Sequence, residues 1–151
     1  RKVWPENKPL MMRFSVQDWH PDGWQIEDSI ELAKRVKALG VDLIDCSSGG
    51  FHGAKVAVGR SYQVPLSRAV RHGAGVATSA VGLIPDAAEA ERIIADGDAD
   101  LIAFGRTALD NPNWPVHALR TLQPGDDAYS LWPPQAGNDI RNKDRALATS
   151  G

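Results

Sequence analysis

Four short apolar runs, separated by segments with helical periodicity, constrain the fold of this chain most strongly. They are PLMMRFS at 9–15, VDLIDCSSG at 41–49, GAGVATSAVG at 73–82 and DLIAFG at 100–105. Their centres are 32, 32 and 26 residues apart, and each run is mostly apolar rather than alternating. Such runs are typical of strands in a parallel sheet that is buried on both faces.

The segments between the runs have the spacing of amphipathic helices. EDSIELAKRVKALG ends at Gly40, VPLSRAVRHG ends at Gly73, and PDAAEAERIIADG ends at Gly97. The order is therefore strand then helix, four times over, at about the 30-residue period of right-handed βαβ units. An open doubly wound sheet and half of an eight-stranded barrel both have this order. Neither a dinucleotide-binding glycine fingerprint nor a P-loop favours the open sheet.

The last part of the chain differs in composition from the rest. The stretch WPPQAGNDIRNKDRALATSG is rich in Pro, Gly, Asn and charged residues, so we expect one domain over 1–122 and an irregular tail over 123–151. The chain starts at Arg1 without Met, and its first residues look like the end of a preceding helix. We therefore expect it to be a piece of a longer protein.

Composition limits the class of protein and its partners. The 151 residues are 42% hydrophobic with a formal charge of −2, which suits a domain with a core and argues against nucleic acid or an anionic membrane as partner. No apolar run approaches the roughly 20 residues of a membrane helix. The single cysteine, Cys46, excludes an internal disulfide, so we expect a cytoplasmic protein. The four histidines lack paired metal spacing, so no metal site is expected.

Two neighbouring strand ends each offer a glycine. Val81 and Gly82 end the third run, and Gly105 with Arg106 ends the fourth. In parallel α/β folds the ligand lies at the carboxyl ends of the strands, where glycines let backbone N–H groups approach phosphate oxygens. Arg106 can bond two oxygens, and a short helix beginning near Thr107 would add a positive end. We expect a phosphate cradle, which in eight-stranded barrels follows strands seven and eight.

Several residues have a structural and a functional interpretation. Arg13 lies within an apolar run, so it either forms a structural ion pair or faces an anionic or electron-rich ligand. Cys46 is expected to be a buried core thiol rather than a nucleophile, since no histidine lies beside it. Trp114 either packs in the interior or lines a pocket. Taken alone, Gly105 and Arg106 also fit an ordinary turn with a solvated cation.

Residues 1–122 resemble the C-terminal half of the Old Yellow Enzyme family in five motifs that occur in the right order. These motifs are MMRFSVQDW, GVDLIDCSSGG, SYQVPLSRAVR, ATSAVGLI and ADLIAFGRTALDNPNWP. They are most similar to the bacterial branch of flavin-dependent NAD(P)H oxidoreductases. The resemblance implies strands five to eight of a TIM barrel, non-covalent FMN, and hydride transfer from NAD(P)H to flavin N5 and onward to an activated alkene. It also leads us to expect a homo-oligomer or a missing N-terminal half.

The resemblance also implies roles for individual residues. Arg13 matches the strand-five arginine at the pyrimidine edge of the flavin, where its charge would stabilise negative charge near N1 and O2 of the reduced ring. Val81 and Gly82 match the strand-seven loop, and Gly105 and Arg106 match the strand-eight pair. Both pairs are implied to hold the FMN phosphate.

The chain departs from the family pattern at several points. The substrate-binding histidine pair of strand four would precede Arg1, so no catalytic residue is expected in this chain. Trp114 matches an aromatic position near the active site in some members. Ser79 stands where glycine is common, Asp110 where arginine is frequent, and Ala136 where a tyrosine is expected. Two alternatives remain: an inactive half barrel, and another barrel that binds FMN or a phosphate ligand.

Overall fold

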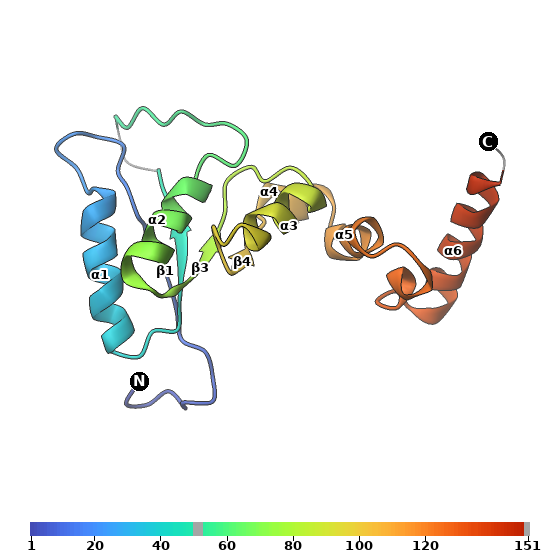
Figure 1. The fold of residues 1–151 in the computed structure, drawn as a ribbon, viewed down its shortest axis with the longest axis horizontal. Helices are drawn as coiled ribbons and strands as arrows, with labels where there is room; N and C mark the ends of the chain where they lie inside the picture. The colour runs from blue at the N-terminus through green and yellow to red at the C-terminus, as the bar shows by residue number, and fades with distance from the viewer. Residues whose placement is uncertain (50–52, 150–151) are drawn as a thin grey trace. The chain divides into compact units, whose positions relative to one another are not determined.

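The computed structural model describes residues 1–49 and 53–149 and contains one parallel sheet (Figure 1). Its strands are β1 (Met11–Ser15), β2 (Leu43–Ser47), β3 (Ala77–Ala80) and β4 (Leu101–Ile102). Each strand lies within one of the four apolar runs, and the spatial order β1-β2-β3-β4 follows the chain. The predicted parallel α/β sheet is confirmed. Among the described strands there is no reversal of order, which a doubly wound sheet requires.

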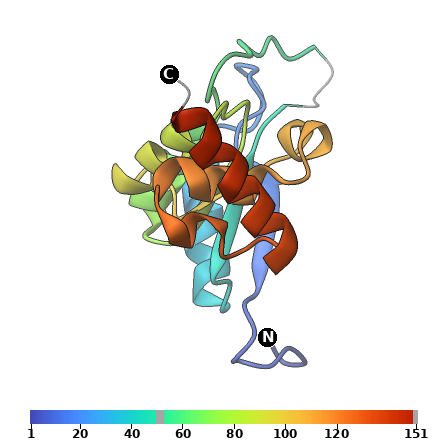
Figure 2. The ribbon, with the colours of Figure 1, turned by 90° about the vertical axis from the view of Figure 1, so that its right-hand side faces the viewer.

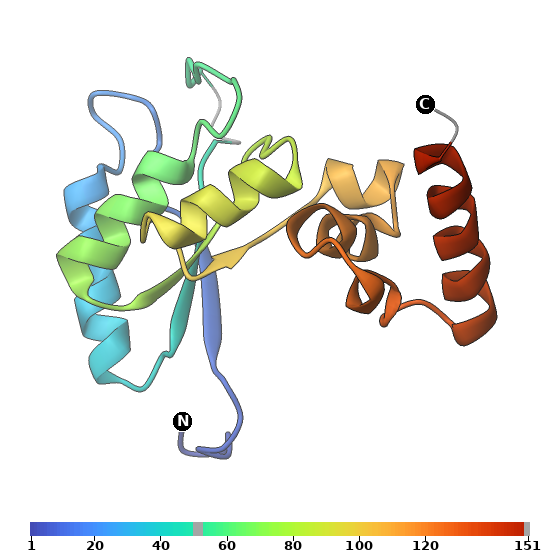
Figure 3. The same cartoon turned by 45° about the vertical axis from the view of Figure 1, so that its right-hand side comes forward.

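Two helices, α1 (Ile26–Ala38) and α2 (Val64–Ala74), pack on one face of this sheet. A third helix, α3 (Ala87–Ala95), connects β3 to β4. Ile44 and Cys46 of β2 are fully buried in the same apolar cluster as Ala33 of α1 and Val70 of α2. Figure 3 shows α1 and α2 on the same side of β1 and β2, and Figure 2 shows these two strands side by side. The core of this region therefore lies between the two helices and the sheet.

Glycines end two of the helices where the sequence predicts it, but not the third. Gly40 and Gly97 follow α1 and α3 with φ of +92° and +74°, the left-handed conformation that glycine adopts readily. The predicted stop at Gly73 is wrong, because α2 continues to Ala74 and Gly75 takes the left-handed position. Gly73 lies inside the helix, where a β-carbon would come within 2.8 Å of the Ile30 side chain. The absence of a side chain at Gly73 therefore allows α1 and α2 to approach closely.

The chain divides into two compact units, one formed by Arg1–Pro85 with Glu89–Phe104 and the other by Asp86–Ala88 with Gly105–Gly151. The described secondary structure that follows residue 104 lies in the second unit. It consists of α4 (Arg106–Asp110), α5 (Trp114–Leu122), the 3-10 helix η1 (Asp126–Tyr129) and α6 (Pro134–Ala148). The short helix predicted near Thr107 is confirmed by α4.

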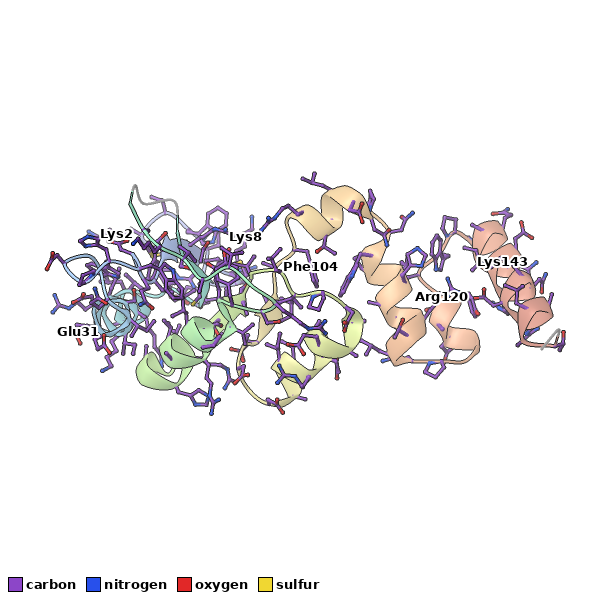
Figure 4. The ribbon with its side chains drawn as sticks, turned by 90° about the horizontal axis from the view of Figure 1, so that it is seen from above. Lys2, Lys8, Glu31, Phe104, Arg120 and Lys143 are labelled. Atoms are coloured by element: carbon purple, nitrogen blue, oxygen red, sulfur yellow. The ribbon has the colours of Figure 1, made fainter. Side chains whose placement is uncertain are left out.

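The expectation of an irregular tail is wrong over α6. Its prolines stand at the start of the helix, where a missing N–H costs little, and its glycine, Gly137, is buried against Tyr129. Asp144 on α6 pairs with Arg120 on α5 and accepts a hydrogen bond of 2.9 Å from the Tyr129 hydroxyl. Figure 4 labels Arg120 on α5 and Lys143, which precedes Asp144 in the sequence of α6. These contacts tie the helix to the rest of the second unit. Within residues 1–49 and 53–149, no helix is long and apolar enough to cross a membrane.

Candidate functional site

The sheet face opposite α1 and α2, here called the helix-free face because neither of these two helices covers it, carries polar side chains in adjacent strands. Side chains alternate between the two faces of a strand, so the burial of Cys46 against the helices directs Asp45 to the other face. Arg13 is the register partner of Asp45 on β1, and Ser79 is its partner on β3. The three residues therefore form one row across the helix-free face.

Arg13 is held in this row by two hydrogen bonds. Its Nη1 donates to Oδ2 of Asp45 at 2.7 Å, and its Nη2 donates to the Ser47 hydroxyl at 3.2 Å. The Arg13 side chain remains 56% exposed, whereas that of Asp45 is 19% exposed. The ion-pair interpretation of Arg13 is confirmed. A guanidinium has five N–H donors, so the ion pair leaves it able to face a ligand as well.

The expectation of a sheet buried on both faces is wrong for β1. Met11, Met12 and Arg13 are exposed, as is Leu101 of β4. β1 is an edge strand, and Met11 and Arg13 lie on the face away from α1 and α2, the helices that bury Ile44. Met12, the register partner of Ile44, is on the other face and is exposed at the strand edge. The apolar composition of the first run therefore reflects surface that the described residues do not bury.

Cys46 is the core thiol that the sequence predicts. It is fully buried, and its Sγ donates to the Ile44 carbonyl oxygen at 3.7 Å. Burial, together with the neighbouring Asp45 carboxylate, raises the pKa of the Cys46 thiol to about 12. A thiol with this pKa is almost entirely protonated at neutral pH and is a poor nucleophile.

Gln63, at the start of α2, connects the segments that follow two strands. Its side chain is almost fully buried. Its Oε1 accepts a hydrogen bond of 2.6 Å from the Ser48 hydroxyl after β2, and its Nε2 donates to the Val81 carbonyl oxygen after β3 at 3.4 Å. Sequence reasoning missed this residue, although it stands in the SYQVP motif directly before a helix with an early proline.

Both the backbone conformation at position 82 and the neighbouring side chains require a glycine there. Its φ is +121°, and a β-carbon there would lie 2.8 Å from Nε2 of Gln63 and 3.1 Å from the Tyr62 ring. Leu83 follows with a φ of +54°, which is unusual for a residue that is not glycine. The loop after β3 therefore approaches Gln63 closely at Gly82 and has a strained backbone at Leu83.

Gly105 and Arg106 lie in the second unit, at the start of α4. A β-carbon on Gly105 would meet no atom within 4 Å, so the described neighbours do not require glycine there. Arg106 is exposed as the first residue of α4, and Trp114 is half-buried as the first residue of α5. The joint cradle of Gly105 and Arg106 with Val81 and Gly82 stays a prediction, as does the role of Trp114.

Asp110 and Ala136 also lie in the second unit, the first at the end of α4 and the second in the first turn of α6. Among the described residues, no cluster of His, Cys, Asp or Glu is arranged to hold a metal ion.

A parallel α/β sheet with polar groups after its strands is the architecture of a ligand-binding α/β enzyme domain. The profile of the NADH:flavin oxidoreductase / NADH oxidase family matches residues 1–124, and the chain belongs to this family. The predicted family resemblance is thereby confirmed.

Two relatives carry the name NADPH dehydrogenase. The protein of Geobacillus sp. (strain WCH70) is 46% identical over 122 residues, and that of Geobacillus thermodenitrificans (strain NG80-2) is 44% identical over 122 residues. Each alignment covers 81% of this chain but 35% of the relative. The chain thus spans about a third of the length of the curated relatives that it matches.

Proposed function

We propose that this chain supplies the C-terminal half, strands five to eight, of an FMN-binding TIM barrel in an NAD(P)H oxidoreductase that reduces activated alkenes. The observation that carries the proposal is the position of Arg13, a half-exposed cation on the helix-free face of four parallel strands in chain order. In a barrel this face is the interior, and the carboxyl ends of its strands bear the active site. The similarity to two NADPH dehydrogenases supports the same activity.

The chemistry of Arg13 fits the pyrimidine end of a flavin. The carbonyl oxygens and N1 of that ring accept hydrogen bonds, and an arginine offers only donors. Asp45 and Ser47 fix the guanidinium from one side while more than half of the side chain stays exposed. Arg13 would hold the ring edge and stabilise the negative charge that reduction places there.

The loop residues fit the phosphate end of the same cofactor. Gly82 has the left-handed backbone found where a main chain approaches an anion closely, and Gly105 has open space beside its α-carbon. Arg106 adds an exposed guanidinium that can bond two phosphate oxygens. Val81 and Gly82 with Gly105 and Arg106 would therefore bind the phosphate.

When bound, FMN would supply the hydride-transfer chemistry between NAD(P)H and the alkene. The residues of this chain would bind and orient the cofactor, and the charge of Arg13 would stabilise the reduced ring. Most of the groups that bind the substrate would come from the N-terminal half of the barrel. Trp114 would line the substrate pocket.

The exposed apolar side chains on and beside the helix-free face support a half barrel. Met11, Met12 and Leu101 are large, apolar and exposed, which is costly for a surface that meets water. The N-terminal half would cover them and pair with the edge of β1.

The reduced, buried Cys46 suits a cytoplasmic enzyme.

The test is spectroscopic and kinetic. The full-length protein, purified without added flavin, should show the absorbance of bound flavin, release FMN on denaturation, and oxidise NAD(P)H when an enone is supplied. Bound FMN without alkene reduction would instead favour another FMN barrel. A folded protein that binds no flavin would contradict the proposal.

A further inference from the structure

Three successive residues after β3 are held from the segment that precedes α2. The carbonyl oxygen of Val81 accepts a hydrogen bond from the Gln63 amide, and a β-carbon on Gly82 would lie 2.8 Å from the nitrogen of the same amide. The Leu83 carbonyl oxygen accepts a hydrogen bond of 3.3 Å from the Ser61 backbone N–H. The loop Val81–Leu83, here called the β3 loop, is thus fixed at each of its residues.

Gln63 is the centre of this arrangement. Its residue exposure is 3%, and the hydrogen bond from the Ser48 hydroxyl to Oε1 orients its amide so that Nε2 faces the β3 loop. An amide fixed in this way cannot turn without burying an unpaired donor or acceptor. The loop after β2 and the loop after β3 are therefore coupled through one side chain.

The backbone around Gln63 is strained at two residues. Leu83 and Ser61, which donates to the Leu83 carbonyl oxygen, both have a φ of +54°, whereas Gly82 adopts its φ of +121° without strain because it has no side chain. Left-handed backbone at residues other than glycine persists only where neighbours over-determine it, and it concentrates at ligand sites.

We propose that Gln63 is a positioning residue for the phosphate of FMN, which acts by holding the β3 loop in the conformation that receives it. The inference rests on the proposed function. Because Gln63 is 3% exposed and its amide bonds to the β3 loop, we expect its effect to be specific to the phosphate end of the cofactor. The protein should consequently lose preference for FMN over riboflavin, which lacks the phosphate, when Gln63 is changed.

The experiment compares FMN and riboflavin affinities of the full-length protein by quenching of flavin fluorescence. Gln63→Glu keeps the size but removes the donors to Val81, and Ser48→Ala removes the bond that orients the amide. We expect the FMN-to-riboflavin preference to fall about tenfold in Gln63→Glu and about threefold in Ser48→Ala, with riboflavin affinity unchanged. Ser67→Ala is the matched control, because it weakens α2–β3 packing away from the loop and should keep the wild-type preference.

The outcomes distinguish failure of the role of Gln63 from failure of the proposed function. Unchanged preference in Gln63→Glu and Ser48→Ala, with FMN still bound by the wild type, would overturn the role of Gln63 and leave the proposed function standing. Equal losses of FMN and riboflavin affinity would show a merely structural role and would also overturn it. A wild-type protein that binds neither flavin would overturn both claims. If Gln63→Glu does not fold, the preference measured for Ser48→Ala decides whether the role of Gln63 stands.

Discussion

Arg13 on β1 and Asp45 on β2 are direct partners in the parallel register, and their side chains form a hydrogen bond of 2.7 Å. The other oxygen of Asp45, Oδ1, is buried and has no hydrogen-bond partner among the residues that the structure describes. Arg13 therefore compensates a carboxylate that is largely shielded from water, while its own side chain stays half-exposed. The pair fixes a cation on the face where we propose that the flavin ring lies.

Arg13→Ala should make the bound flavin harder to reduce. Loss of the cation removes stabilisation of the negative charge on the reduced ring, so we expect the midpoint potential to fall by about 30 mV or more, a tenfold change for a two-electron couple. Asp45→Asn removes a negative charge from the same place and should shift the potential upward. Spectroelectrochemical titration at saturating FMN measures both. If the midpoint potential of Arg13→Ala equals that of the wild type, Arg13 does not lie at the pyrimidine edge of the flavin.

Alanine substitutions at Gly82 and Gly105 should differ in their effects: the first should lower the stability of the fold, and the second should weaken FMN binding. Gly82→Ala forces a β-carbon to 2.8 Å from Gln63 in a left-handed backbone, so it should lower the free energy of unfolding by about 1–3 kcal/mol. Gly105→Ala meets no neighbouring atom and should leave stability nearly unchanged while weakening FMN binding. Urea unfolding and FMN titration give the two quantities. Equal destabilisation by both substitutions would contradict the prediction.

The stability conferred by Asp100 should depend on pH. Arg71 donates two hydrogen bonds of 2.9 Å to its carboxylate. These bonds, and one from the Thr78 backbone N–H, outweigh burial and lower the pKa of Asp100 below its ordinary 3.8. A lowered folded-state pKa stabilises the protein above the unfolded-state value, and this contribution disappears as the pH falls through the folded-state value.

Asp100→Asn should accordingly lower the free energy of unfolding at neutral pH, and the deficit should shrink below about pH 4. Asp96→Asn is the control, because Asp96 pairs with Arg92 on an exposed helix surface and should have little effect at either pH. Urea titrations at both pH values provide the comparison. A deficit for Asp100→Asn that is the same at neutral and acid pH would count against the ion pair.

Cys46 should resist alkylation in the folded protein. With a pKa of about 12, its thiolate fraction at pH 8 is about a thousandfold lower than that of an ordinary thiol, and burial blocks access further. Iodoacetamide labelling followed by mass spectrometry should detect one modified cysteine only after unfolding in urea. Rapid labelling without denaturant would show that the core around Ile44 and Cys46 opens easily.

The strands and helix ends were predictable because local rules determine them. Short apolar runs with no alternation are what a parallel sheet needs, and Gly40 and Gly97 are where a helix can turn left-handed at little cost. These features depend on residues that are close together in the chain. The sequential strand order does not, because an open doubly wound sheet and half of a barrel share the same alternation of strands and helices.

The features that were missed depend on distant residues or on position within an element. The partners of Gln63, Ser48 and Val81, are 15 and 18 residues away, so its burial could not be inferred from the SYQVP motif. The register that pairs Arg13 with Asp45 is likewise a tertiary property. The sequence predicted an irregular tail where α6 forms, because that prediction counted prolines without regard to their position. Prolines at the start of a helix are tolerated, whereas prolines in its interior break it.

The FMN dissociation constant of the full-length protein, compared with that of Arg106→Ala, tests the flavin site most directly. The phosphate does not change during hydride transfer, so loss of Arg106 should weaken FMN binding about 10- to 100-fold and leave turnover at saturating FMN nearly normal. Arg68→Ala, which removes another exposed arginine that pairs with Asp98, should keep the wild-type affinity. If Arg106→Ala binds FMN as tightly as the wild type, or if the wild type binds no FMN, the proposed phosphate site is contradicted.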